Sequence, residues 1–152
     1  MTYQFAAGLL LMAAQCSAAE LSLRPVPSAS GESTVLIVTL SSSAGAPAAA
    51  LTGIQFDLEY DVSTFEVSVS SGAISQGAGK GISTAANGSG KRVLVVGLNQ
   101  NALSDGVVAV LHVVRKGPAA PEQVIRLAAP AGTNGAGTSI QLALRDSERL
   151  VP

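Results

Sequence analysis

The side chains that could carry chemistry in this chain are few, and their carboxylates cluster. Four of the ten acidic residues lie between positions 57 and 66, with Asp57 and Glu59 two positions apart. Paired carboxylates can hydrolyse a glycosidic bond, but a solvated strand face explains the same spacing equally well. The single histidine, His112, stands in an apolar run, where a face residue is far more common than a catalytic base. No serine lies in a nucleophile elbow, and we predict that the chain is not an enzyme.

The sequence also gives little material for a metal site. Cys16 is the only cysteine, so the rest of the chain cannot build a thiolate site. The acidic residues lack the oxygen-ligand spacing of a calcium loop. Asp105-Gly106 and Asn134-Gly135 are pairs typical of turns. We therefore predict no metal and no cofactor.

Composition narrows the classes of partner. The formal net charge is -1 and no cluster of lysine and arginine is present, so we expect no nucleic acid partner. The chain has no tryptophan, and its aromatic residues beyond position 20 are Phe56, Tyr60 and Phe65. Their spacing directs all three toward a core, which disfavours a stacking platform for sugar rings.

The first residues are typical of a targeting segment. Residues 5–14 are apolar but too short to span a bilayer, which takes about 20 residues. Small residues follow, and we predict a secretory signal peptide over 1–19, cleaved after Ala18 or Ala19. The mature chain would be secreted or periplasmic, with no membrane span. Gln15 before Cys16 disfavours lipidation of that cysteine. The alternative to a signal peptide is a buried N-terminal strand or helix.

The element that must position the carboxylates is the strand over 53–60, which alternates strictly. Its apolar side carries Ile54, Phe56, Leu58 and Tyr60. Its polar side carries Gln55, Asp57 and Glu59. One face in a core and one in water is typical of a strand in a two-layer β protein.

The remaining chain predicts about nine short strands and no convincing helix, with turn signals at the spacing of a β-sandwich. The expected strands are 21–27, 33–41, 53–60, 65–70, 81–86, 91–98, 107–114, 124–127 and 140–144. A further short strand is possible around Ile74, the strand over 91–98 is apolar on both faces, and 131–137 reads as a Gly-rich loop. Residues 147–152 are predicted to be a C-terminal tail.

The central strand and its surroundings resemble a cohesin domain. The similar residues are Gly53 to Asp61, then Phe65-Glu66-Val67, and later the strands over 93–96 and 105–111. The resemblance implies an all-β, nine-stranded antiparallel β-sandwich of jelly-roll topology over 20–146. Val62 replaces the proline that usually follows Tyr-Asp in the family, and Gly53 and Gln55 stand where many relatives have Asn or Asp.

The resemblance also implies a binding face, because cohesins receive dockerins on one sheet face that includes the central strand. Carried over, that face holds Gln55, Asp57 and Glu59. If Ala109 and Leu111 point to the core, the neighbouring long strand would add outward side chains. The further candidates are Val108, Val110 and His112 on that strand, with Asn99 and Gln100 at the edge of the face. An equally good explanation of the outward valines is that β-branched residues favour strands and take no part in binding.

The resulting expectation is a secreted, non-catalytic scaffolding module that recognises a dockerin-like protein, linked to polysaccharide degradation. The first alternative is a carbohydrate-binding module that contacts polysaccharide directly. The second alternative is an extracellular structural or adhesive module.

Overall fold

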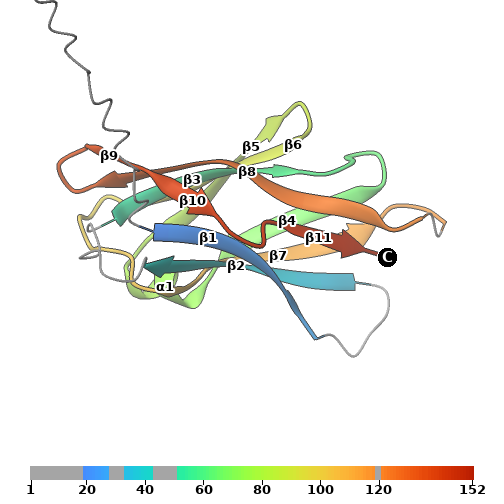
Figure 1. The fold of residues 1–152 in the computed structure, drawn as a ribbon, viewed down its shortest axis with the longest axis horizontal. Helices are drawn as coiled ribbons and strands as arrows, with labels where there is room; N and C mark the ends of the chain where they lie inside the picture. The colour runs from blue at the N-terminus through green and yellow to red at the C-terminus, as the bar shows by residue number, and fades with distance from the viewer. Residues whose placement is uncertain (1–18, 28–32, 43–50, 119–120) are drawn as a thin grey trace, which may run out of the picture.

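The computed structural model describes residues 19–27, 33–42, 51–118 and 121–152 (Figure 1). The strands are β1 Ala19–Val26, β2 Ser33–Ser42, β3 Leu51–Glu59, β4 Phe65–Ser71, β5 Gly81–Asn87, β6 Gly90–Val96, β7 Gly106–Arg115, β8 Gln123–Asn134, β9 Ser139–Ile140, β10 Leu142–Leu144 and β11 Glu148–Val151. One short helix, α1, spans Ala73–Gly77. Residues 1–18 of the predicted signal peptide over 1–19 lie outside the described ranges, and Ala19 is the first residue of β1. No helix in these ranges is long and apolar enough to cross a membrane.

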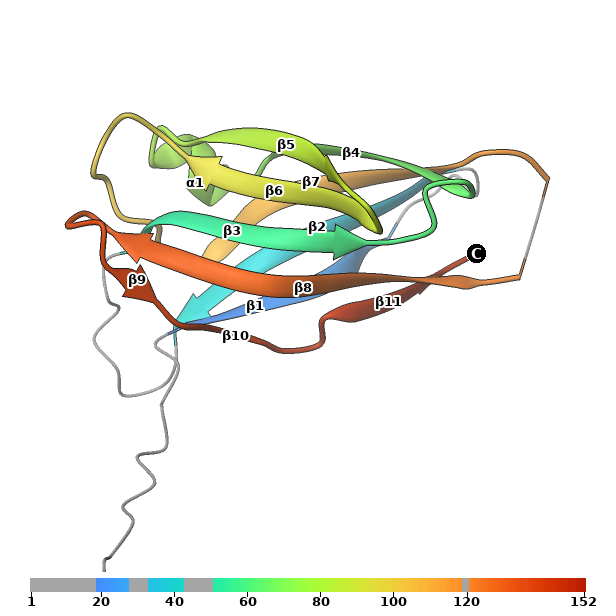
Figure 2. The ribbon, with the colours of Figure 1, turned by 90° about the horizontal axis from the view of Figure 1, so that it is seen from above.

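The strands form two sheets that pack face to face (Figure 2). The first sheet has the order β10-β1-β2-β7-β4, and the second has the order β11-β8-β3-β6-β5, with β9 beside β8. Neighbouring strands run antiparallel except β1 and β10. The predicted β-sandwich is confirmed. The described ranges hold eleven strands, because 139–144 divides into two and 148–151 adds another.

The core lies between the two sheets, and β3 contributes its apolar side as predicted. Phe56 is completely buried, with Ile54 and Leu58 beside it. The first sheet contributes Leu21 and Leu111 to the same core, and both are fully buried. Burying a side chain of this size stabilises the fold by about 1.5–3 kcal/mol. Because the apolar side of β3 is held in the core in this way, only its polar side is left on the surface.

The turn that follows β3 is built on one carboxylate. Asp61 Oδ1 accepts hydrogen bonds from the backbone N–H and the hydroxyl of Ser63, and Oδ2 accepts one from Thr64 Oγ1. These donors, the Ser63 hydroxyl first, lower the pKa of Asp61 to about 2. A short polar side chain that binds its own backbone two residues on is a turn former, so β3 ends here and β4 begins at Phe65.

The possible strand around Ile74 is instead the helix α1. Ser75 is fully buried and its hydroxyl donates to the carbonyl of Val108 at 2.7 Å. The backbone N–H of Gly72 donates to the same carbonyl at 3.0 Å. The turn-rich sequence therefore closes one helical turn against β7. This contact joins segments far apart in the chain, so local sequence does not show it.

The predicted tail over 147–152 instead contains strand β11. Its four residues pair antiparallel with β8, from Glu148 opposite Arg126 to Val151 opposite Gln123. Val151 is only 2% exposed and belongs to the core. The reason is the length of β8, which has twelve residues and would otherwise leave its outer edge open.

β8 is longer than the sequence indicates because it accommodates a bulge. Its register against β3 shifts between Gln55 and Asp57, and Ala129 takes a positive φ of 45°. Pro130 follows at this point, where a missing N–H costs no regular ladder hydrogen bond. The segment after the bulge, part of the expected Gly-rich loop, therefore continues as strand to Asn134.

Each of the three lysines of the chain ties its ammonium to a distant backbone carbonyl. Lys80 donates to the carbonyl of Asn99 at 2.7 Å, and Lys116 donates to that of Val62 at 2.9 Å. Lys91, on the second sheet, donates to Val67 on the first sheet. These bonds join segments that are far apart in sequence.

Candidate binding face

The outer face of the second sheet holds the polar side of β3. Register places the β6, β8 and β5 residues next to it on the same face. We call this surface the candidate binding face, and it comprises Gln55, Asp57, Glu59, Asn87, Arg92, Leu94, Val96, Arg126, Ala131 and Thr133. The sequence prediction that Gln55, Asp57 and Glu59 share one face agrees with the structure.

The centre of the candidate binding face is an ion pair with two hydrogen bonds. Arg92 Nε lies 2.8 Å from Asp57 Oδ1, and Arg92 Nη2 lies 2.9 Å from Oδ2. Asn87 Nδ2 donates to Oδ2 at 2.8 Å. The hydrogen bonds from Arg92 are the largest cause of a lowered pKa at Asp57, burial opposes them, and the charge of Arg92 and the amide of Asn87 lower it further.

A second charged group lies toward the other end of β3. Arg126 Nε is 2.8 Å from Glu59 Oε2, and Arg126 Nη1 is 3.5 Å from Glu148 Oε1. Glu59 and Arg126 face each other across the β3–β8 pair. Surface pairs of this kind contribute little to stability, but they cancel much of the local charge. The charges of this face are therefore already paired within the chain.

Beside the ion pairs lies a shallow depression of about 150 Å³ that is mainly apolar. Leu94 and Val96 of β6 line one side, and Ala131 of β8 lines the other. Its floor is open because position 53 is a glycine: a β carbon there would lie 2.9 Å from Thr133 Oγ1. An apolar hollow with a polar rim is typical of the centre of a protein interface.

The apolar surface continues beyond the depression. Val96 is 45% exposed, and Leu98, two residues further, is fully exposed. The sequence prediction did not select Leu94, Val96 or Leu98 as binding residues. The signal was present, because this strand was the one found apolar on both faces, and only one of those faces can enter the core.

Two of the remaining predicted residues lie on the other sheet. β7 is not a neighbour of β3: it lies between β2 and β4 in the first sheet, so Val110 and His112 lie on the opposite surface of the sandwich. His112 is exposed and Val110 is half-buried. Sequence alternation assigns a residue to a face of its strand but does not tell which sheet the strand joins.

Val108 is not an outward residue, and this part of the prediction is wrong. Its side chain is completely buried. The register between β2 and β7 shifts, with Val38 opposite Ala109 and Thr39 opposite Val107. The extra residue of this bulge restarts the alternation, so Val108 and Ala109 both enter the core.

The loop after β6 carries the last two candidates. Asn99 Nδ2 donates to the carbonyls of Ala78 and Gly79, at 3.1 and 3.2 Å, so this amide holds the segment after α1. Gln100 is exposed and lies beside Gly135 in the turn after β8. Asn99 therefore has a structural role, whereas Gln100 lies at the end of the sandwich reached by β8.

The acidic side chains of the candidate binding face are held by arginine partners. In residues 19–27, 33–42, 51–118 and 121–152, no three His, Cys, Asp or Glu side chains come together as a metal site. Asp57 and Glu59, two of the four clustered carboxylates, are each paired with an arginine. The arrangement offers shape and apolar contact on a broad sheet surface.

The fold and this surface define a β-sandwich module that presents one broad sheet face. The chain belongs to the cohesin family, because the family model for the cohesin domain matches residues 19–140. The sequence-based resemblance and the predicted fold class are thus confirmed. Comparison with curated protein sequences finds no match.

Solved cohesin structures share the fold at low sequence identity. The sixth cohesin of Acetivibrio cellulolyticus scaffoldin B, in complex with a mutant Cel5 dockerin, is 22% identical with a TM-score of 0.65, covering 87% of this chain and 97% of its own. A cohesin module from a Clostridium perfringens family 33 glycoside hydrolase is 17% identical with a TM-score of 0.69, covering 90% and 96%. A non-cellulosomal cohesin from Archaeoglobus fulgidus is 14% identical with a TM-score of 0.65, covering 88% and 91%.

Proposed function

We propose that this chain is a non-catalytic scaffolding module that binds a dockerin-type protein through the candidate binding face. Membership of the cohesin family supports a protein partner, and solved relatives bind dockerins. The observation that carries the choice of face is the depression at Gly53, which continues into Val96 and Leu98. Apolar side chains in a hollow with a paired, polar surround are where interfaces concentrate binding energy.

The ion pairs give this face its selectivity. A partner that covers Asp57 and Arg92 meets a preformed pair whose mutual hydrogen bonds are already satisfied, so it gains little attraction from opposite charge. Affinity then rests on filling the depression between Leu94 and Ala131. We infer that the partner places an apolar side chain there and keeps its own charges at the rim.

The test compares two valines of equal exposure on opposite faces. Val96 is 45% exposed on the candidate binding face, and Val114 is 46% exposed on β7 of the other sheet. Calorimetry would use dockerin modules encoded in the same genome. Val96→Gln should weaken binding at least tenfold, which is about 1.4 kcal/mol, while Val114→Gln should change it less than twofold. Equal effects of the two substitutions, or no dockerin bound by the wild type, would contradict the proposal.

We also propose that the protein is exported and serves polysaccharide degradation. Export is supported by the apolar run over 5–14 and the small residues that follow it. One structural relative is a scaffoldin cohesin and another belongs to a glycoside hydrolase. Amino-terminal sequencing of the protein from the culture fluid of its host should begin at Ala19 or Glu20. Uncleaved protein found only inside cells would contradict export.

A further inference from the structure

The two sheets have four outer strands, and three of them are protected against pairing with another chain. β10 has only three residues, and β11 has four, of which Glu148 and Arg149 are charged. On β4, Lys91 from the opposite sheet takes up the carbonyl of Val67. Short strands, charges and covered backbone groups are the usual means of protecting a sheet edge.

The fourth outer strand, β5, has none of these features. Its seven residues carry no charge and no proline. Its register with β6 is regular from Gly81 opposite Val96 to Asn87 opposite Gly90, so no bulge turns the edge away. About half of its backbone N–H and C=O groups point away from β6, since alternate residues of an antiparallel pair face the partner. In the part of the chain that the structure describes, no side chain hydrogen-bonds to the β5 backbone.

The sequence of β5 is compatible with pairing to itself. Two copies that run antiparallel with all seven residues overlapping place Thr84 opposite Thr84. Ile82 then lies opposite Ala86, and Ser83 lies opposite Ala85. No like charges meet in this register, and cross-strand pairs of threonine are favourable. The formal net charge of -1 adds little repulsion between copies.

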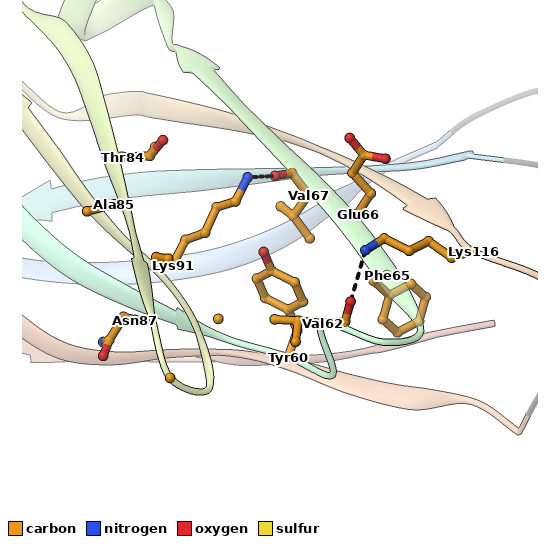
Figure 3. A pocket seen from close by; sticks show the side chains of 13 residues that line it. Tyr60, Val62, Phe65, Glu66, Val67, Thr84, Ala85, Asn87, Lys91 and Lys116 are labelled. Atoms are coloured by element: carbon orange, nitrogen blue, oxygen red, sulfur yellow. Dashed lines mark hydrogen bonds between the residues drawn. The ribbon is translucent and has the colours of Figure 1, made fainter.

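A groove beside β5 leaves space for the side chains of a second copy of this strand. It has a volume of about 550 Å³ and runs between β5 and the edge of β4 (Figure 3). Thr84 and Ala86 line it from β5, and Glu66 and Val67 line it from β4. The side chains that a second β5 would direct toward this groove include Thr84 and Ala86, and both are small. The groove therefore leaves space below the β5 edge for the small side chains of a second copy of this strand.

We infer that two copies of this chain associate through antiparallel β5–β5 pairing. The second sheets of the two copies then join into one continuous sheet. The two-fold axis stands perpendicular to that sheet, so both candidate binding faces lie on the same surface. The inference does not depend on which partner the face binds, and its test uses the protein alone.

Light scattering over rising protein concentration tests the association. Seven residue pairs make a small interface, and small interfaces are transient. For the full 152-residue chain, the mass should therefore rise gradually from 15.1 kDa toward twice that value. Thr84→Lys sets two ammonium groups opposite each other and should raise the dimer dissociation constant at least tenfold. Ser68→Lys, an exposed change of the same charge on the outer face of β4, should leave it unchanged. Wild-type protein that stays monomeric throughout, or equal effects of the two changes, overturns the inference.

Disulfide formation tests the register. In a Cys16→Ser background, Thr84→Cys brings two thiols directly opposite each other, with β carbons about 4.5–5.5 Å apart. Ser83→Cys, also exposed, leaves the two thiols on a diagonal of about 7–8 Å, beyond the reach of a disulfide. Mild oxidation should link the first variant into dimers at least tenfold faster than the second. Equal rates, or faster linking at position 83, overturn the proposed register.

Discussion

Asp57 lies in the middle of the candidate binding face, yet only a tenth of its side chain is exposed to water. Arg92 and Asn87 occupy its oxygens, and Arg92 itself remains 44% exposed. A carboxylate in this position looks available when only the alternation of β3 is known. Its neighbours on β5 and β6, which the sequence does not identify, decide that it is a structural group.

The pH dependence of stability should show this role. The hydrogen bonds from Arg92 hold the pKa of Asp57 below the usual 3.8 in the folded state. The stabilisation is therefore present above the unfolded pKa and is lost as the pH falls through the folded pKa. Asp57→Asn should cost about 1.5–3 kcal/mol at pH 7, the range for a hydrogen bond to a charged group.

Urea unfolding at pH 7, 5 and 3 measures the difference. The difference in the free energy of unfolding between wild type and Asp57→Asn should be smaller at pH 3 than at pH 7. Glu66→Gln, which changes an exposed carboxylate on β4, serves as the control and should show a much smaller gap at every pH. A gap for Asp57→Asn that stays constant between pH 7 and pH 3 would show that the ionised carboxylate is not responsible.

At the scale of elements, the hairpin between β5 and β6 depends on one glycine. Gly90 has a φ of 153°, and a β carbon there would lie 1.9 Å from the carbonyl oxygen of Leu58. Gly88, in the same turn, has open space around it. Gly90→Ala should destabilise the fold by about 2–4 kcal/mol, because the backbone of β3 must move. Gly88→Ala should change stability by less than about 0.5 kcal/mol, and thermal unfolding of the two variants compares them directly. Similar melting temperatures would contradict this reading of the hairpin.

The strand β11 makes a comparable pair of predictions. Val151 is buried in the core, whereas its neighbour Leu150 is 63% exposed. Val151→Ala removes two buried methyl groups and leaves a cavity, so we expect a loss of about 1.5–3 kcal/mol. Leu150→Ala should be nearly neutral although it removes more atoms. If chemical denaturation finds both variants as stable as wild type, β11 does not pack as described.

The elements also show what the sequence could and could not predict. Strict alternation placed β3 correctly, because Phe56 and its apolar neighbours all enter the core. The same rule failed at Val108, where a bulge against Val38 adds a residue that the pattern does not reveal. β11 was missed because Ser-Glu-Arg-Leu-Val is too polar to indicate a strand, and its pairing with β8 is a long-range contact. Local pattern gives faces, whereas bulges and sheet partners depend on the whole fold.

At the scale of the whole molecule, the candidate binding face has charges that are already paired. Asp57 pairs with Arg92, and Glu59 and Glu148 pair with Arg126. Long-range steering should therefore be weak, and affinity should depend on apolar contact. We expect the dissociation constant for the dockerin partner to change less than threefold between 50 and 500 mM NaCl. Surface plasmon resonance measures this, and a tenfold or greater weakening would show that unpaired charge dominates recognition.

The lysine contacts have a practical consequence for such measurements. Lys80, Lys91 and Lys116 each hold a backbone carbonyl with their ammonium group, and Lys80 is only 4% exposed. Amine-reactive reagents need a free, deprotonated lysine, so attachment at these positions competes with the native structure. Lys116 is exposed and Lys91 is half-buried, whereas coupling through Lys80 would select locally opened molecules. An affinity tag at a chain end is therefore the better anchor for a sensor surface, and the rate of acylation at Lys80, followed by mass spectrometry, measures local opening around that residue.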